Sequence, residues 1–219
     1  MIALERLIVS IFEAVVDAVL PPHPDVRLAR ALSADDLASL YGPRAAGATW
    51  ATALFPYRDP KVQALIRAVK YRGETRALVP AAEILGSWIA ETIAEKRLFA
   101  GWREPIVVPI PSSPARLRAR GYNQTERIAR TTLDSIGDSI GYAPHALSRD
   151  DRPSQVGIER SERNQNVRNA FHVPDASMIK GRFVIVIDDV IETGSTVADA
   201  RRALRAAGAK DVIAVALAH

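Results

Sequence analysis

The hydrophobic residues of this chain fall into continuous runs and into stripes at helical spacing. Residues 183–187 are five consecutive apolar residues, which is typical of a strand buried on both faces, as in a parallel sheet. Residues 106–111 predict a second buried strand, residues 48–57 a strand or hairpin, and residues 212–217 the last strand. These runs predict an α/β fold with a mainly parallel sheet.

Apolar residues at helical spacing predict four helices between and after these strands. They cover about residues 60–70, 76–97, 123–136 and 197–207. Gly208 is expected to close the last helix, because glycine is common just past a helix end.

The first 47 residues are expected to form a helical segment beside a domain at residues 48–219. Residues 2–20 carry an apolar stripe interrupted by acids, which predicts an amphipathic helix and argues against a membrane span. We expect this helix to pack on its own domain or on a second copy in a homodimer; contact with a membrane surface or a partner is the alternative. Ser33 predicts a capped helix start further on.

The composition and net charge of the chain exclude some kinds of functional site. With 48% apolar and 25% charged residues, the chain is typical of a soluble globular protein, and no signal-peptide pattern is present, so a cytoplasmic location is expected. The net charge of +4 suits anionic ligands but does not by itself indicate nucleic-acid binding. The absence of cysteine excludes disulfides, thiolate catalysis and cysteine-bound zinc, and the four histidines lack ligand spacing.

A turn after the strand at residues 183–187 predicts an anion site. The start of a helix presents unpaired N–H groups and the positive end of its dipole, and Gly194 lets the backbone approach an anion closely. The hydroxyls that can donate to the same anion belong to Thr193, Ser195 and Thr196. Asp188 and Asp189 lie between strand and turn, where ribose hydroxyls or Mg²⁺ satisfy adjacent carboxylates. The pattern therefore indicates a phosphorylated sugar; solvated acids beside an ordinary helix cap are the alternative.

A basic segment follows the strand at residues 106–111. Arg116, Arg118 and Arg120 lie within five positions, just beyond the carboxyl end of that strand. Ligands of open α/β sheets bind at this end, and clustered guanidiniums there neutralise a pyrophosphate. A solvated basic loop is the alternative. Lys70 and Arg72 are also placed to reach an anion, or to end a helix favourably.

Two motifs make the chain similar to known families. The apolar strand, the acid pair and Val-x-x-Thr-Gly-x-Thr at residues 190–196 resemble the motif with which type I phosphoribosyltransferases bind phosphoribosyl pyrophosphate (PRPP). Pro-x-Pro followed by Arg-x-x-x-Arg-Gly-Tyr-Asn-Gln at residues 116–124 resembles the ComF family of phosphoribosyltransferase-like competence proteins. The resemblance covers roughly residues 50–219. The chain departs from many members in having no four-cysteine zinc module, and in having Glu192 where threonine is common.

The resemblance implies a type I phosphoribosyltransferase fold, with a mainly parallel open sheet flanked by helices, a small hood and an N-terminal helical segment. Asp188 and Asp189 are implied as the catalytic pair that binds the ribose, with Mg²⁺ held through the ribose or water. The residues implied to bind the 5′-phosphate are Glu192, Thr193, Gly194, Ser195 and Thr196. Those implied to bind pyrophosphate are Ser112, Ser113, Arg116, Arg120, Asn123 and Gln124.

Residues 149–172 are expected to form a lid over the site. The segment is polar and basic, with few apolar residues before Phe171, so it cannot bury itself well. A long segment of this kind within a compact domain is either functional or disordered, and closing over a substrate is one such function. The lid residues singled out are Arg149, Arg160 and Arg163.

Two functions follow as hypotheses. The first is a PRPP-binding, Mg²⁺-dependent phosphoribosyltransferase, in which Arg116, Arg120 and Mg²⁺ take the leaving pyrophosphate; no residue pattern identifies the acceptor. The second is a non-catalytic competence or DNA-uptake accessory protein that binds single-stranded DNA or a partner protein. Only Tyr122 lies near the arginines, so base stacking is weakly supported.

Overall fold

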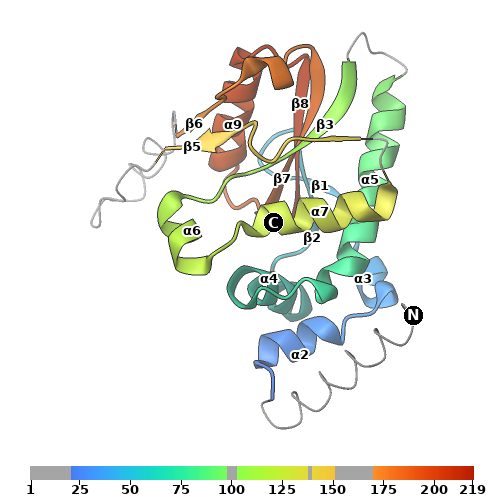
Figure 1. Ribbon diagram of the computed structural model, residues 1–219. Coiled ribbons are helices and arrows are strands. Elements are labelled where there is room, and N and C mark those ends of the chain that lie inside the picture. The colour runs from blue at the N-terminus through green and yellow to red at the C-terminus, as the bar shows by residue number, and fades with distance from the viewer. Residues whose placement is uncertain (1–20, 98–102, 138–139, 151–169) are drawn as a thin grey trace, which may run out of the picture.

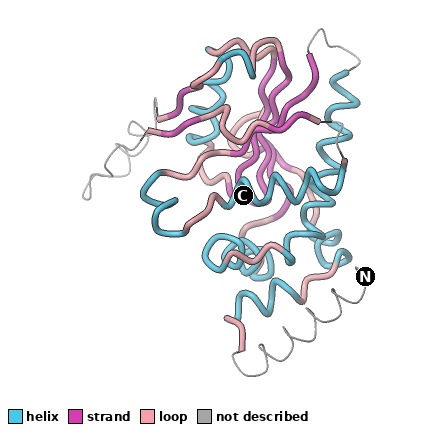
Figure 2. The backbone as a smooth tube through the Cα atoms, in the orientation of Figure 1, coloured by secondary structure: helices cyan, strands magenta, loops and turns pink. Residues whose placement is uncertain are grey.

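The sheet lies at the centre of the molecule and is covered by helices on both faces (Figures 1 and 2). The computed structural model describes residues 21–97, 103–137, 140–150 and 170–219. The order of the strands is β1-β2-β8-β7-β3-β4, and every pair is parallel except β1 with β2. The strands are β1 Arg44–Ala45, β2 Ala51–Phe55, β3 Arg103–Pro109, β4 Gly141–Tyr142, β7 Arg182–Val190 and β8 Asp211–Ala218.

The helices are α2 Pro24–Arg30, α3 Ala34–Leu40, α4 Pro60–Arg72, α5 Val79–Arg97, α6 Pro114–Arg120, α7 Gln124–Ile136 and α9 Ser195–Ala206, with short 3₁₀ turns η1 Arg76–Leu78 and η2 Ala176–Met178. The helices α4, α5, α7 and α9 follow the four predicted stripes, and α2, α3 and α6 are formed in addition. The fold class, a mainly parallel sheet flanked by helices, is confirmed.

The apolar run of β7 is buried on both faces, as its lack of alternation predicts. Phe183, Ile185 and Ile187 point into a core shared with α4, α5 and α7, whereas Val184 and Val186 point into a second core shared with α9. All five side chains are fully buried. The strand therefore fixes both helical layers, and its position next to β3 fixes what lies at its carboxyl end.

The described part of the N-terminal segment packs on the first of these cores. Val26 of α2 and Leu37 of α3 are buried together with residues of α4 and α5. Ser33 caps α3 with a capping box: its hydroxyl accepts from the Asp36 amide, and the Asp36 carboxylate accepts from the Ser33 amide. The capped start is confirmed, and the helix expected at residues 2–20 lies outside the described residues.

One helical stretch, Arg76–Arg97, is long and apolar enough to cross a membrane by length and composition alone. A buried helix of a globular core satisfies the same criteria. Leu78, Leu85 and Ile89 are fully buried in the core that this stretch shares with α4 and α7, so burial in the core accounts for its apolar character.

A two-stranded ribbon beside α9 is fixed by a buried acid. β5 (Ser148–Arg149) and β6 (Phe171–His172) pair antiparallel. The Asp199 carboxylate of α9 accepts from the amides of Ala170 and Phe171, at 2.7 and 3.2 Å, and from the Arg202 guanidinium. Because these two amides are buried, the carboxylate is needed to satisfy them.

Replacing this acid is expected to destabilise the fold. Asp199→Ala leaves two buried amides without an acceptor, which costs roughly 2–4 kcal/mol and should lower the melting temperature by roughly 5–12 °C. Thermal unfolding followed by circular dichroism measures the change. Glu95→Ala, an exposed acid of α5, serves as the control, and equal melting temperatures for the two variants would contradict the role given to Asp199.

Candidate functional site at the carboxyl edge of the sheet

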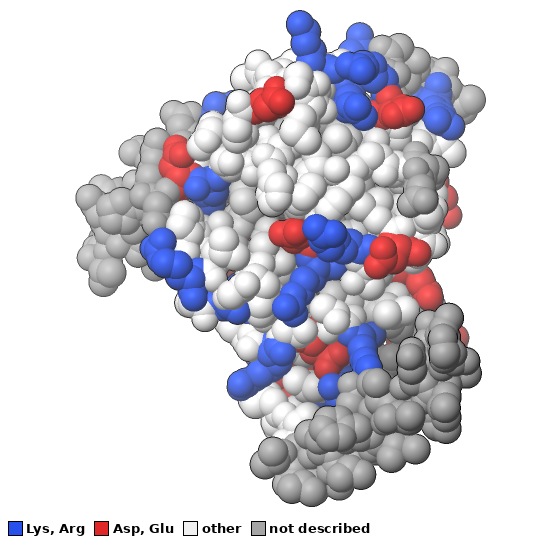
Figure 3. Space-filling view, viewed as in Figure 1, with Lys and Arg blue, Asp and Glu red and all other residues white. Residues whose placement is uncertain are grey.

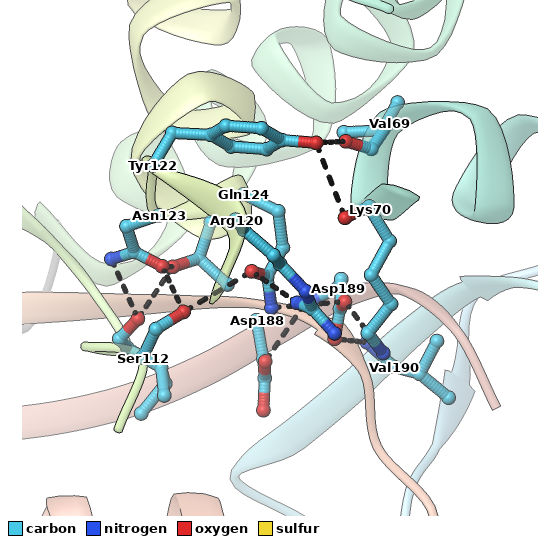
Figure 4. A network of polar contacts seen from close by, with 12 residues as sticks. Val69, Lys70, Ser112, Arg120, Tyr122, Asn123, Gln124, Asp188, Asp189 and Val190 are labelled. Atoms are coloured by element: carbon cyan, nitrogen blue, oxygen red, sulfur yellow. Dashed lines mark hydrogen bonds and ion pairs between the residues drawn. The ribbon is translucent and has the colours of Figure 1, made fainter. Parts of the chain in front are cut away.

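The carboxyl ends of β7 and β3 bring together the two polar segments that the sequence singles out. The strands are parallel neighbours, with Pro109 opposite Ile187. Asp188 and Asp189 at the end of β7 therefore lie beside the segment that begins at Ser112 (Figure 4). Open α/β sheets bind their ligands at this edge.

The two carboxylates are buried side by side. Asp188 is 7% and Asp189 6% exposed. One Asp188 oxygen accepts from the Asp189 amide at 2.9 Å, and one Asp189 oxygen accepts from the Val190 amide at 2.8 Å. Burial and the neighbouring Asp189 carboxylate raise the pKa of Asp188 well above its usual range, while the Asp189 amide and Lys70 oppose that rise. The site is thus built around two adjacent carboxylates whose negative charges are only partly offset by hydrogen-bond donors and cations.

The second Asp189 oxygen has two partners from other elements. The Lys70 ammonium, in the last turn of α4, lies 3.0 Å away, and the Gln124 amide, at the start of α7, lies 3.3 Å away. Lys70 is the partner that brings charge. Figure 4 shows its side chain extending from the end of α4 to the acid.

A polar network ties the start of α7 to the end of β3. The Ser112 hydroxyl lies 2.9 Å from the Asn123 side-chain oxygen and 3.1 Å from that of Gln124. Arg120 donates to the same Gln124 oxygen at 2.9 Å, and the Asn123 amide donates to the Ile110 carbonyl. Four of the six residues expected to bind pyrophosphate therefore lie in one network that reaches Asp189 through Gln124.

The basic segment that follows β3 is helical. Residues 114–120 form the short helix α6, because Ser113 caps its first turn, Pro114 starts it and Gly121 ends it in the left-handed region. Arg116 and Arg118 are exposed on this helix. In Figure 3 basic side chains gather along the edge over α6 and continue towards α4.

The turn before α9 has the geometry of an anion site. Gly194 is the N-cap residue of α9 with φ 77°, and no side chain caps the helix. A β-carbon at Gly194 would make only an ordinary contact, 3.4 Å from the Ala46 carbonyl oxygen, so it is the left-handed conformation that favours glycine here. The hydroxyls of Thr193 and Ser195 lie 2.9 Å apart, and Thr193 and Glu192 are exposed. The turn is therefore open to a ligand.

Of the three lid residues, the structure describes only Arg149, since Arg160 and Arg163 lie outside the described residues. The Arg149 guanidinium lies over the Phe171 ring at 5.3 Å. Burial and the nearby Arg116 lower the pKa of Arg149, against the influence of Asp188 and Asp199. Arg149 thus belongs to the surroundings of the acid pair.

Two residues of the site were not identified among the sequence-based site residues. Lys70 was weighed only as an anion contact or a helix end, and Tyr122 only as a lone aromatic residue. The Tyr122 hydroxyl contacts the carbonyls of Val69 and Lys70 at 3.0 and 3.2 Å. Tyr122 belongs to the ComF-like motif at residues 116–124, but the contacts of both residues span more than fifty positions and follow from no local pattern.

Comparisons with known proteins agree with the motifs. Residues 126–219 match the phosphoribosyl transferase domain family. The chain is 27% identical over 112 residues to Competence protein F of Haemophilus influenzae, covering 48% of this chain and 46% of that protein. It is 27% identical over 133 residues to Competence protein ComFC of Streptococcus pneumoniae, covering 59% of this chain and 52% of that protein. The chain thus spans about half the length of these curated relatives.

A comparison of structures finds a similar region in an enzyme described as the allosteric regulatory enzyme of purine biosynthesis, with 19% identity, a TM-score of 0.41, and coverage of 68% of this chain and 30% of that one. The family match and the relatives together confirm the resemblance drawn from the acid pair and the basic segment. The chain is thus similar to ComF-type competence proteins, and its residues 126–219 match a phosphoribosyl transferase domain.

Proposed function

We propose that this protein binds PRPP with Mg²⁺ at the carboxyl edge of its sheet and acts on the phosphoribosyl group. The observation that carries the proposal is the buried acid pair between two sites suited to anions. The uncapped start of α9 lies on one side, and the network from Ser112 to Gln124 lies on the other. A ligand with a phosphate at one end, ribose hydroxyls in the middle and a pyrophosphate at the other fits this order.

Magnesium fits the acids that the site provides. Mg²⁺ keeps several waters and binds through one or two carboxylates together with substrate phosphates. Within the described residues, no group of three or more histidine or acidic side chains is arranged to hold a metal. The pair Asp188 and Asp189 therefore suits an ion that arrives with the substrate, held through ribose hydroxyls or water. Such an ion supplies positive charge to the pyrophosphate oxygens.

The residues of the chain have separate parts in this proposal. Asp188 and Asp189 accept hydrogen bonds from the ribose hydroxyls and stabilise positive charge that develops on the sugar. Arg116 and Arg120 face the pyrophosphate, where guanidiniums bind phosphate oxygens strongly. The residues at the start of α9, Thr193 to Thr196, donate to the 5′-phosphate.

The first test is binding of PRPP by isothermal titration calorimetry, with and without Mg²⁺. At about pH 9, above the raised pKa of Asp188, Asp188→Asn removes one charge with little change in shape, and we expect about 10-fold to 100-fold weaker binding because a charged hydrogen bond is lost. Asp134→Asn, an exposed acid of α7, is the matched control and should bind like the wild type. A wild-type chain that binds no PRPP in the presence of Mg²⁺ would contradict the proposal.

The same substitution is expected to stabilise the ligand-free protein. The pKa of Asp188 is raised in the fold, so protonation stabilises the fold at low pH, and this stabilisation is lost as the pH rises through the folded-state pKa. Asp188→Asn should therefore have little effect at about pH 4, near the unfolded-state pKa, and should add about 1–2 kcal/mol of stability at about pH 9. Urea unfolding at both pH values measures the free energy of unfolding of the two proteins. A variant less stable than the wild type at the higher pH would contradict the argument that the buried, ionised Asp188 destabilises the fold.

A second candidate function is binding of single-stranded DNA, as part of a competence or DNA-uptake role with partner proteins. Two observations favour it: relatives are named as competence proteins, and α6 exposes Arg116 and Arg118. This function needs no catalysis, because arginine contacts to phosphates supply the affinity.

DNA binding of this kind depends on salt in a defined way. Affinity for a fluorescent oligonucleotide should fall steeply between low salt and about 200 mM salt, and Arg118→Ala should reduce the slope of log affinity against log salt by about one. Fluorescence anisotropy measures both, with Arg97→Ala, an exposed arginine at the end of α5, as the control. Affinity that does not change with salt would rule out phosphate contacts.

A further inference from the structure

The last turn of α4 brings a cation to the acid pair from outside the segments assigned to the ligand. Lys70 reaches Asp189 with its ammonium 3.0 Å from one carboxylate oxygen. The Lys70 side chain is 23% exposed and that of Asp189 is 9% exposed, so water screens this ion pair only partly. A lysine that only favoured a helix end would need no acid partner.

The contacts of the two acids differ. Both Asp189 oxygens have partners, namely Lys70 and Gln124 on one and the Val190 amide on the other. One Asp188 oxygen accepts from the Asp189 amide, and among the described residues no lysine, arginine or amide side chain is hydrogen-bonded to Asp188 as Lys70 and Gln124 are to Asp189. Asp189 is therefore oriented by side chains of other elements, whereas Asp188 is not held in this way.

Contacts from Tyr122 and Arg127 hold the backbone at the end of α4, where Lys70 lies. The Tyr122 hydroxyl contacts the carbonyls of Val69 and Lys70, which lie in the last turn of α4. Arg127 lies over the Tyr122 ring at 3.6 Å and donates to the Gly73 carbonyl at 2.6 Å. These contacts satisfy carbonyls that every helix leaves free at its end, and they hold Lys70 against the turn that carries Gln124.

We propose that Lys70 is a positioning residue for the ribose: its ammonium holds Asp189 against Gln124, so that the acid pair presents fixed oxygens to the ribose hydroxyls. Lys70 compensates one of the two adjacent negative charges. Arg120 reaches Asp189 only through Gln124. Fixing a carboxylate before the ligand arrives removes part of the cost of ordering it on binding.

This inference rests on the proposed function and gives it a finer prediction. If Lys70 acts through Asp189, it affects ligands that contain ribose. If it contacted the leaving group directly, it would affect pyrophosphate instead. Three ligands separate these cases in the presence of Mg²⁺: PRPP, ribose 5-phosphate, which lacks pyrophosphate, and inorganic pyrophosphate, which lacks ribose.

The experiment measures dissociation constants of the three ligands for the wild type and two variants of Lys70. Lys70→Met keeps the length of the side chain without its charge, and it should weaken PRPP and ribose 5-phosphate by about 10–100-fold, as loss of a supporting residue commonly does. Pyrophosphate should change by less than about twofold. Lys70→Arg should restore most of the affinity for the two ribose ligands.

Two further variants control for damage to the fold. Lys61→Met removes an ion pair with Asp36 at the other end of the same helix and should leave all three affinities unchanged. Tyr122→Phe removes only the hydroxyl brace and should weaken the same two ribose ligands less than Lys70→Met does. If Lys70→Met does not fold, the dissociation constants of Tyr122→Phe for the three ligands test whether Lys70 acts on the ribose.

The outcomes distinguish the inference from the function beneath it. A wild-type chain that binds neither PRPP nor ribose 5-phosphate contradicts the proposed function. Wild-type binding together with unchanged ribose affinities in Lys70→Met overturns only the role of Lys70. Loss of pyrophosphate affinity as large as the loss for ribose 5-phosphate also overturns it, because that result assigns Lys70 to the phosphates.

Discussion

The burial of two like charges at the end of β7 is the constraint on which the site depends. The strand is packed from both faces, so Asp188 and Asp189 leave the core with little contact with water. Adjacent carboxylates in such surroundings raise the energy of the ionised pair unless donors or cations meet them. Lys70, Gln124 and the backbone amides of residues 189 and 190 provide this compensation for Asp189 far better than for Asp188.

The compensation comes from parts of the chain that are distant in sequence. α4 supplies the ammonium, the start of α7 supplies an amide, and β5 brings Arg149 towards Asp188. These elements meet because β3 and β7 are parallel neighbours and because the helices that follow them return over the sheet. The fold thus builds a site at an edge of the sheet where the end of α4, the start of α7 and the end of β7 bring polar groups together.

The rigid part of the site and its exposed part consist of different residues. Asp189 and the network from Ser112 to Gln124 are held by hydrogen bonds within the protein. Thr193 in the turn and Arg116 and Arg118 of α6 are exposed and have the charges and donors that phosphates need. A fixed pair of acids with exposed polar and basic groups on each side is the arrangement on which the proposal of a PRPP site rests.

The strands β2, β3, β7 and β8, the helices α4, α5, α7 and α9, and the acid pair could be predicted from the sequence, because each depends on residues close together in the chain. The apolar run of β7, the capping box at Ser33 and the glycine at the start of α9 are local, and the structure has them where they were predicted. The partners of the acids could not be predicted in this way, because they come from distant parts of the chain. Lys70 and Asp189 are more than a hundred residues apart, and no local spacing reveals an ion pair that strand order creates. Helix α6 was missed because its seven residues bury no side chain, so it leaves no apolar periodicity to detect.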